Sequence, residues 1–264
     1  MAVKRPKKRE EREVDYGKYF SSCAGDYNVV SCVNLAFLEA SRDLARQNIR
    51  LRIPEFSRWA VLTLHQRPPQ MWDQVKRYLE LVYAAARGAF QNVFKFEFSL
   101  ETPLTIHTRW PYLPLEIGIA WHPILNVPYI PASSLKGALR AAAPEPVCDF
   151  TKAELFGTAQ EEGLLVVFDA YPTGGKAVRP DVVTPHYREV EGEIAETQAS
   201  PVPLVFPTVP PGTKFQFMVG ILPRDEKREV DYKKCEMELF DAVKKTLVRG
   251  LGAKTAVGYG VFKI

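Results

Sequence analysis

The chain has 264 residues, of which 46% are hydrophobic and 25% are charged, and its formal net charge is +4. This composition is ordinary for a globular protein and excludes a low-complexity or disordered chain. No stretch approaches the roughly 18 apolar residues of a membrane span, and the charged N-terminus is not followed by the apolar run of a secretory signal. We therefore expect a cytoplasmic protein without membrane contact, built as one large domain or as one domain with an extension. The small positive charge favours an acidic partner only weakly.

The four cysteines show no metal-binding spacing. Cys23, Cys32, Cys148 and Cys235 form no C-x-x-C pair and have no histidines arranged beside them. A zinc site is therefore not expected, and no cofactor is implied. We expect four free, mostly buried thiols in a reducing compartment.

The first third of the chain predicts a tail followed by helices. Residues 1–30 open with clustered lysines and arginines, which is typical of a flexible, solvated tail. Over residues 31–92 apolar side chains recur at helical spacing, as at Val33, Phe37 and Leu44. This segment predicts a helical extension that packs on a core formed by residues 93–264.

Residues 93–264 predict an α+β domain. The expected order is a strand at 94–100, a helix at 133–143, strands at 164–171 and 213–222, a helix at 231–249 and a strand at 256–264. This β-α-β-β-α-β order is the ferredoxin-like pattern, which RNA-recognition (RRM-like) modules share. Residues 172–203 show no clear period and predict a long loop or projecting hairpin.

The segment Pro128–Arg140 combines a helix start with phosphate-binding groups. Ser133 follows a proline-fixed run and is expected to cap the helix. Ser133, Lys136 and Arg140 then share one face, and Gly137 leaves room for close approach. A hydroxyl, an ammonium and a guanidinium near a helix N-terminus favour phosphate.

The segment 250–260 carries four glycines around a Lys-Thr pair. Its sequence is Gly-Leu-Gly-Ala-Lys-Thr-Ala-Val-Gly-Tyr-Gly. Free N–H groups beside Lys254 and Thr255 predict a clamp for a sugar–phosphate backbone. A nucleotide-binding P-loop is excluded, because Ala253 stands where that motif needs glycine and the loop leads from a helix into a strand.

Segments 130–140 and 250–260 together resemble the RAMP superfamily of CRISPR RNA-binding proteins. The sequence Pro-Asp-Val-Val-Thr-Pro-His-Tyr at 180–187 narrows the resemblance to the subunit-six family of type III-B Cmr effector complexes. The resemblance covers about residues 93–264. It implies a non-catalytic, antiviral subunit that binds CRISPR guide RNA on its 3′ side, helps to position target RNA, and contacts the backbone and head RAMP subunits of the Cmr complex.

The resemblance also implies where RNA binds. A glycine-rich loop precedes the last strand in such proteins, and a hairpin "thumb", here about residues 172–203, pushes between guide and target nucleotides. The RNA-binding residues implied are Ser133, Ser134, Lys136, Gly137, Arg140, Gly250, Gly252, Lys254, Thr255, Gly258, His186 and Arg188.

One departure from the family bears on catalysis. Backbone RAMP subunits that cut target RNA carry an aspartate in the loop before the Ser-Ser-Leu-Lys-Gly helix, whereas residues 120–124 here read Ala-Trp-His-Pro-Ile. Between Leu100 and Leu139 the only carboxylates are Glu101 and Glu116. We therefore expect a subunit that does not cut RNA.

Two other functions stay open at this point. A guide-processing ribonuclease would use a histidine as general acid or base, and the candidates are His107, His122 and His186. An assembly subunit without RNA contact would use exposed apolar residues of the proline-rich stretch. Its candidates are Trp110, Tyr112 and Trp121.

Overall fold

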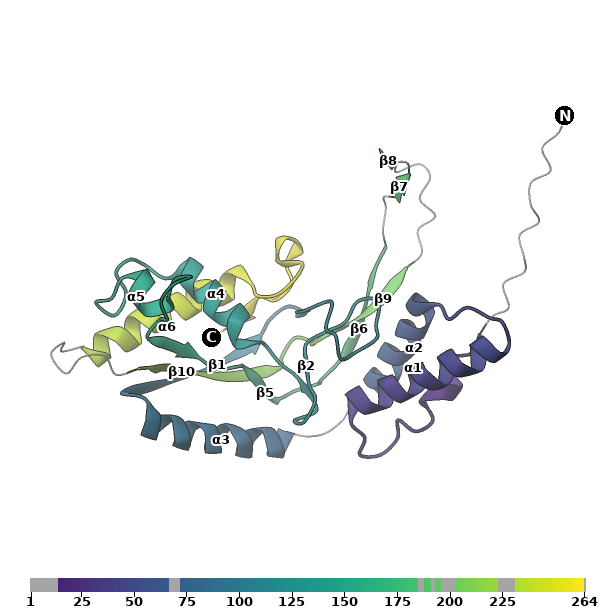
Figure 1. Ribbon diagram of the computed structural model, residues 1–264. Coiled ribbons are helices and arrows are strands. Elements are labelled where there is room, and N and C mark those ends of the chain that lie inside the picture. The colour runs from purple at the N-terminus through teal and green to yellow at the C-terminus, as the bar shows by residue number, and fades with distance from the viewer. Residues whose placement is uncertain are drawn as a thin grey trace.

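The structure is a computed structural model that describes residues 14–66, 72–184, 188–190, 193–195, 203–222 and 231–263 (Figure 1). The helices are η1 (Gly17–Phe20), α1 (Val29–Arg46), α2 (Ile53–Gln66), α3 (Trp72–Ala89), α4 (Ala132–Ala142), α5 (Lys152–Phe156), α6 (Tyr232–Arg249) and η2 (Thr255–Val257). The strands are β1 (Asn92–Leu100), β2 (Trp121–His122), β3 (Val127–Pro128), β4 (Leu165–Val167), β5 (Tyr171–Gly174), β6 (Arg179–Val183), β7 (Arg188–Val190), β8 (Glu193–Ala195), β9 (Leu204–Thr208), β10 (Lys214–Ile221) and β11 (Phe262–Lys263).

The central sheet is antiparallel. Its strands follow the order β11-β1-β10-β4, and β5 also pairs with β10. The predicted alternation in β1 is confirmed, because Phe94, Phe96 and Phe98 are buried between exposed or half-buried neighbours. Phe96 lies opposite Phe217 on β10, and their rings stack at 5.1 Å. The mixed α+β class is confirmed.

Helices cover both faces of this sheet. Figure 1 shows α4 and α6 on one side and α3 on the other. The main core contains Leu135 and Leu139 of α4 with Leu239 of α6. A smaller cluster on the opposite side joins Val75 and Leu79 of α3 to residues of β3, β5 and β10. The sheet is therefore packed on both faces, with the larger core on the side of α4 and α6.

Two predicted strands are shorter than expected. The apolar run 164–171 is divided into β4 and β5, because Ala170 exchanges both backbone hydrogen bonds with Ile130 at 2.9 Å and so leaves the ladder. The predicted closing strand 256–264 is strand only at Phe262–Lys263, and its first part forms η2 and a turn.

The irregular insertion is a projecting hairpin (Figure 1). β6 and β9 pair antiparallel from Arg179 opposite Thr208 to Val183 opposite Leu204, and β7 pairs with β8 further out. The hairpin thus spans 179–208 rather than 172–203, since residues 172–174 belong to the central sheet through β5. Helix α2 contacts both β6 and β9, so the hairpin base is supported by the helical extension.

Part of the predicted tail is packed rather than flexible. Tyr16, Tyr19 and Phe20 are buried, and the Phe20 and Phe56 rings lie 5.3 Å apart. The Tyr16 hydroxyl accepts a hydrogen bond from the Arg52 N–H at 2.9 Å. The cationic cluster of residues 1–13 lies outside the described residues.

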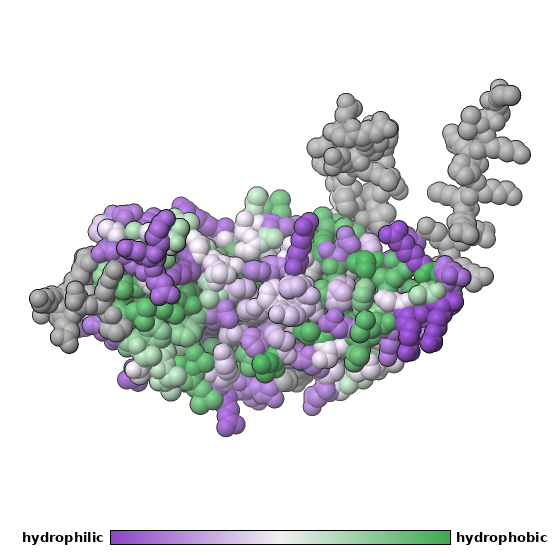
Figure 2. All heavy atoms as spheres, viewed as in Figure 1, coloured by the Kyte–Doolittle hydropathy of each residue, from purple (hydrophilic) through white to green (hydrophobic). Residues whose placement is uncertain are grey.

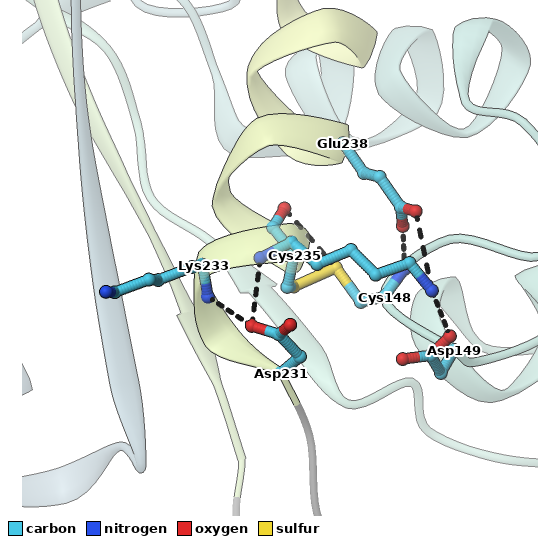
Figure 3. Close-up of polar contacts among 7 residues, drawn as sticks. Cys148, Asp149, Asp231, Lys233, Cys235 and Glu238 are labelled. Atoms are coloured by element: carbon cyan, nitrogen blue, oxygen red, sulfur yellow. Dashed lines mark hydrogen bonds and ion pairs between the residues drawn. A yellow bond between two sulfur atoms is a disulfide. The ribbon is translucent and has the colours of Figure 1, made fainter.

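The cysteines are buried as expected, but the expectation of free thiols is wrong. Cys23 is bonded to Cys32, and Cys148 is bonded to Cys235. Figure 3 shows the second disulfide at the N-terminal end of α6, where the Cys148 N–H also donates to Glu238. Sequence spacing did not indicate these pairs, because the fold alone brings their Cα atoms to 5.7 and 4.4 Å.

None of the helices in the described part of the chain combines the length and the apolar character needed to cross a membrane.

Candidate nucleic-acid interface

A groove of about 500 Å³ lies between α4 and residues 250–260, here called the glycine-rich loop. Figure 1 shows this loop in yellow, directly after α6. The groove is lined by Ser134 and Ala138 of α4, by Ile106, His107 and Thr108, and by Gly250–Ala253 and Thr255 of the loop. The fold therefore brings the two predicted motifs to one site, called the α4–loop groove below.

Most of the glycines are required by the loop itself. Gly250, Gly252 and Gly260 have φ values of 90°, 89° and 69°, in the left-handed region that residues with a Cβ seldom adopt. A Cβ on Gly252 would collide with the Thr105 carbonyl oxygen, and a Cβ on Gly260 with that of Leu251. Internal packing thus accounts for these three glycines without any RNA.

The loop offers unused backbone donors to the groove. Within the described residues, the N–H groups of Gly252 and Thr255 form no hydrogen bond, whereas the Ala253 N–H between them donates to the Thr105 oxygen at 2.8 Å. Backbone N–H groups in a left-handed turn form concave sites for anions. The Thr255 side chain is half-buried at the same wall.

His107 and Ser134 form the opposite part of the groove. The His107 Nε2 lies 3.2 Å from the Ser134 Oγ, and His107 has a φ of 53°. Strained backbone of this kind concentrates at functional sites. Sequence reasoning considered His107 only as a catalytic candidate, since residues 106–108 carry no periodicity or motif that places them beside α4.

The outer face of α4 is open. Ser133, Gly137 and Arg140 are exposed, and nothing lies within 4 Å of the position that a Cβ on Gly137 would take. Glycine inside a helix costs about 1 kcal/mol relative to alanine. Since no part of the structure needs a glycine here, the space above Gly137 is free for an external backbone.

Lys136 lies on the other edge of α4. It lines a separate pocket with residues 156–163 and is half-buried, so that desolvation lowers the pKa of its ammonium group while Glu162 acts in the opposite direction. The shared face predicted for Ser133, Lys136 and Arg140 is therefore only partly realised, and Lys136 is not among the groove residues.

The N-terminal end of α4 is already paired with a carboxylate. Asp169 Oδ1 accepts a hydrogen bond from the Ala132 N–H at 2.6 Å. Ser133 is not the cap, because the helix begins one residue earlier with Pro131 in the cap position. The helix dipole therefore contributes less to a phosphate site than the sequence predicts.

Lys254 contacts the hairpin base instead of the groove. Its Nζ lies 4.8 Å from the Phe206 ring centre and 4.6 Å from that of Tyr259, which is cation–π geometry. The Tyr259 hydroxyl donates to Asp181 Oδ2 at 2.6 Å, and desolvation with this bond raises the pKa of Tyr259 to about 12. The ammonium predicted to hold phosphate thus lies against β9, while Tyr259 joins the glycine-rich loop to β6.

The remaining predicted site residues fall in different places. Gly258 has a φ of 88° and open space around it, at the exposed tip of the loop. His186 lies outside the described residues, and for Arg188 the structure gives only its place in β7.

Among the described residues, no group of three His, Cys, Asp or Glu side chains is arranged to hold a metal ion.

Comparison with known proteins identifies relatives of this fold and site. The model of the RAMP superfamily matches residues 97–263. The chain is 29% identical to the "CRISPR system CMR subunit Cmr6" of Saccharolobus solfataricus over 196 residues, 73% of this chain and 65% of that protein. It is 34% identical to the "CRISPR system Cmr subunit Cmr6" of Pyrococcus furiosus over 117 residues, 40% of this chain and 32% of that protein. The chain thus spans less than two thirds of each relative.

A solved structure shows the same fold. One chain of the "Cryo-EM structure of the Type III-B Cmr-beta bound to cognate target RNA" matches with a TM-score of 0.73 over 94% of this chain and 95% of that chain. The identity is 23%, so this likeness concerns the fold. Because the matched family model covers more than half of the sequence and includes both α4 and the glycine-rich loop, the chain belongs to the RAMP superfamily.

Proposed function

We propose that this chain is an RNA-binding subunit of a type III-B RNA-guided effector complex and that it holds the CRISPR guide RNA in the α4–loop groove. The observation that carries this function is the convergence of two distant motifs on one groove with unused N–H donors. The similarity to Cmr6 proteins supports the assignment to that complex.

The donors of the groove favour recognition of phosphate and sugar rather than bases. The N–H groups of Gly252 and Thr255 and the hydroxyl of Ser134 suit phosphate or sugar oxygens. Arg140, exposed on the outer face of α4, adds a guanidinium on the same helix. Contacts of this kind carry no sequence information. This is the property that a subunit needs when the guide sequence varies.

The arrangement of elements supports the finer parts of the proposal. The sheet order β11-β1-β10-β4, with α4 and α6 on one face, suits a ferredoxin-like core. The hairpin 179–208 takes the place of the thumb that positions target RNA. The guide 3′ side, and contact with the backbone and head RAMP subunits, follow from the resemblance to subunit six.

Substitution of Gly137 separates RNA binding from stability. A Gly137→Ala chain is expected to unfold with a free energy up to about 1 kcal/mol higher, because alanine is the better helix residue. The same methyl group would fill the space left for the RNA backbone, and RNA binding is expected to weaken about tenfold, or about 1.4 kcal/mol. Guanidinium unfolding and filter binding with two unrelated guide sequences measure the two effects.

Gly88 provides a matched control. It is an exposed glycine in α3 with equally open space at its Cβ position. Gly88→Ala is expected to leave the RNA affinity unchanged. It should also not lower the free energy of unfolding. Equal RNA affinity of the two variants and the parent chain would remove Gly137 from the interface, and a loss confined to one guide sequence would contradict phosphate recognition.

We propose further that the chain does not cut RNA, because the residues at the expected catalytic position have structural roles. Trp121 is buried and its Nε1 donates to Asn126. The His122 Nδ1 accepts from the N–H groups of Ile124 and Leu125, and desolvation lowers its pKa. Target RNA and repeat RNA incubated with the purified chain, with and without Mg²⁺, should therefore stay intact. Metal-independent cleavage of repeat RNA that disappears in His107→Ala would instead establish the guide-processing ribonuclease.

A further inference from the structure

A second pocket, of about 620 Å³, lies between the end of α2 and the base of the hairpin. Its side chains are those of His65, Lys176 and Arg179, and the rest of its lining is proline and glycine. Among the described residues, the lining of this α2–hairpin pocket includes no carboxylate. The pocket combines residues of the helical extension, of the turn after β5 and of β6. No single sequence motif could therefore predict it.

Within the described part of the chain, no carboxylate pairs with the cations of the pocket. Neither Lys176 nor Arg179 pairs with a carboxylate among the residues that the structure describes. Both side chains are exposed, as is His65. Unpaired cations gathered at one place favour an anionic ligand, because each would gain a partner that the chain itself does not supply.

The walls of the pocket are fixed by buried hydroxyl groups. Thr213 Oγ1 donates to the Pro210 oxygen at 2.8 Å and lies 3.2 Å from the Lys176 oxygen. Thr208 Oγ1 donates to the Arg179 oxygen at 3.0 Å. Both threonines are buried, with exposed fractions of 1% and 0%. The backbone oxygens that would repel an anion are thus turned toward internal donors, and the cationic side chains remain on the open side.

The shape of the pocket suits a strand better than a small molecule. Small-molecule sites bury most of the ligand surface, whereas Lys176, Arg179 and Gly212 are all exposed here. A Cβ on Gly212 would meet nothing within 4 Å, which leaves room for another backbone. Figure 2 shows hydrophilic and hydrophobic residues interspersed over the face of the molecule in that view.

We propose that the α2–hairpin pocket is a second RNA-backbone site, in which Lys176 and Arg179 bind phosphates of a strand that runs along the hairpin base. The inference rests on the proposed RNA-binding function and extends it to a surface partly made by the helical extension. The Arg179 charge also acts on Tyr259, whose hydroxyl joins the glycine-rich loop to Asp181 of β6.

The test is the salt dependence of RNA binding by the full chain. For single strands, log K falls with log salt by about 0.7 per phosphate contact. The double variant Lys176→Ala/Arg179→Ala is therefore expected to bind guide-length RNA with a slope smaller by about 1.4. Lys244→Ala/Lys245→Ala, two exposed lysines of α6, is the matched control and should keep the parent slope.

The outcomes of this measurement distinguish the α2–hairpin site from the α4–loop groove. An unchanged slope in the Lys176/Arg179 variant, while Gly137→Ala still weakens binding, would overturn this site and leave the α4–loop groove intact. A parent chain that binds RNA without salt dependence would overturn both. Adenosine monophosphate serves as the second probe: binding that saturates in the parent chain and disappears in the double variant, with an unchanged RNA slope, would make the pocket a mononucleotide site and refute the strand. Since both side chains are exposed and alanine keeps the backbone hydrogen bonds of residues 176 and 179, the circular dichroism spectrum of the variant should match that of the parent chain.

Discussion

A Gly252→Ala chain is expected to lose about 3 kcal/mol of unfolding free energy and to bind guide RNA more than tenfold more weakly. Two costs combine. A residue with a Cβ pays about 1–2 kcal/mol for the left-handed backbone, and forcing the methyl group against the Thr105 oxygen adds about 1–3 kcal/mol of overpacking. The binding loss follows because relief of the clash moves the Ala253 N–H from Thr105 and displaces the wall of the α4–loop groove.

Gly258 distinguishes backbone strain from collision. It has nearly the same φ, 88° against 89°, but nothing stands within 4 Å of its Cβ position. Gly258→Ala should therefore cost only the backbone part, about 1–2 kcal/mol. Guanidinium unfolding of both variants measures the difference. Equal losses of stability would show that the contact with Thr105 does not hold the loop, and the account of the groove wall would fail with it.

Local patterns in the sequence predicted the elements whose form depends on neighbours along the chain. The alternation Phe94-Lys95-Phe96-Glu97-Phe98 predicted β1, because a strand with one buried face repeats every two residues. The helix α6 ends at Gly250 as expected, and Asp231 caps its start by accepting from the N–H groups of Lys233 and Lys234. In both cases the decisive interactions span only a few residues.

Contacts between distant segments were the part that the sequence did not reveal. Asp169 caps α4 from 37 positions away, and Ala170 leaves the sheet because Ile130 takes its hydrogen bonds. Lys254 lies over the Phe206 ring of β9, 48 positions away along the chain, and its own backbone is left-handed, with a φ of 63°. A motif states which groups are present, whereas the direction of a side chain depends on the fold around it.

The same distinction explains the candidate site. The convergence of α4 and the glycine-rich loop followed from their resemblance to RAMP proteins, and the structure places them at one groove. Their cations were expected to face it, yet Lys136 and Lys254 lie elsewhere. The groove is therefore built from backbone N–H groups and hydroxyls, with Arg140 exposed on the outer face of α4.

Removal of the Cys148–Cys235 disulfide is expected to cost about 4.6 kcal/mol of unfolding free energy. In the chain-entropy model the stabilisation grows with the logarithm of the closed loop, and this disulfide joins residues 87 positions apart. The Cys23–Cys32 bond closes only 9 positions and should contribute about 2.7 kcal/mol. The pair of variants Cys148→Ser/Cys235→Ser and Cys23→Ser/Cys32→Ser therefore forms its own control, measured by guanidinium unfolding without reductant.

The first disulfide variant also reports on the groove. Figure 3 shows that Cys235 anchors the start of α6, where Lys234 pairs with Asp149 and Glu238 accepts from the Cys148 N–H. The glycine-rich loop begins at the opposite end of the same helix, and α4 packs along it, with the Thr246 Oγ1 3.4 Å from the Ala138 oxygen. Because the contacts between α4 and α6 remain, the Cys148→Ser/Cys235→Ser variant should keep the RNA affinity of the parent chain at denaturant concentrations well below its unfolding midpoint. Equal stability of the two double variants, or four reactive thiols in the folded parent chain, would contradict the two disulfides. A loss of RNA binding in the folded Cys148→Ser/Cys235→Ser variant would show that the groove depends on the N-terminal end of α6.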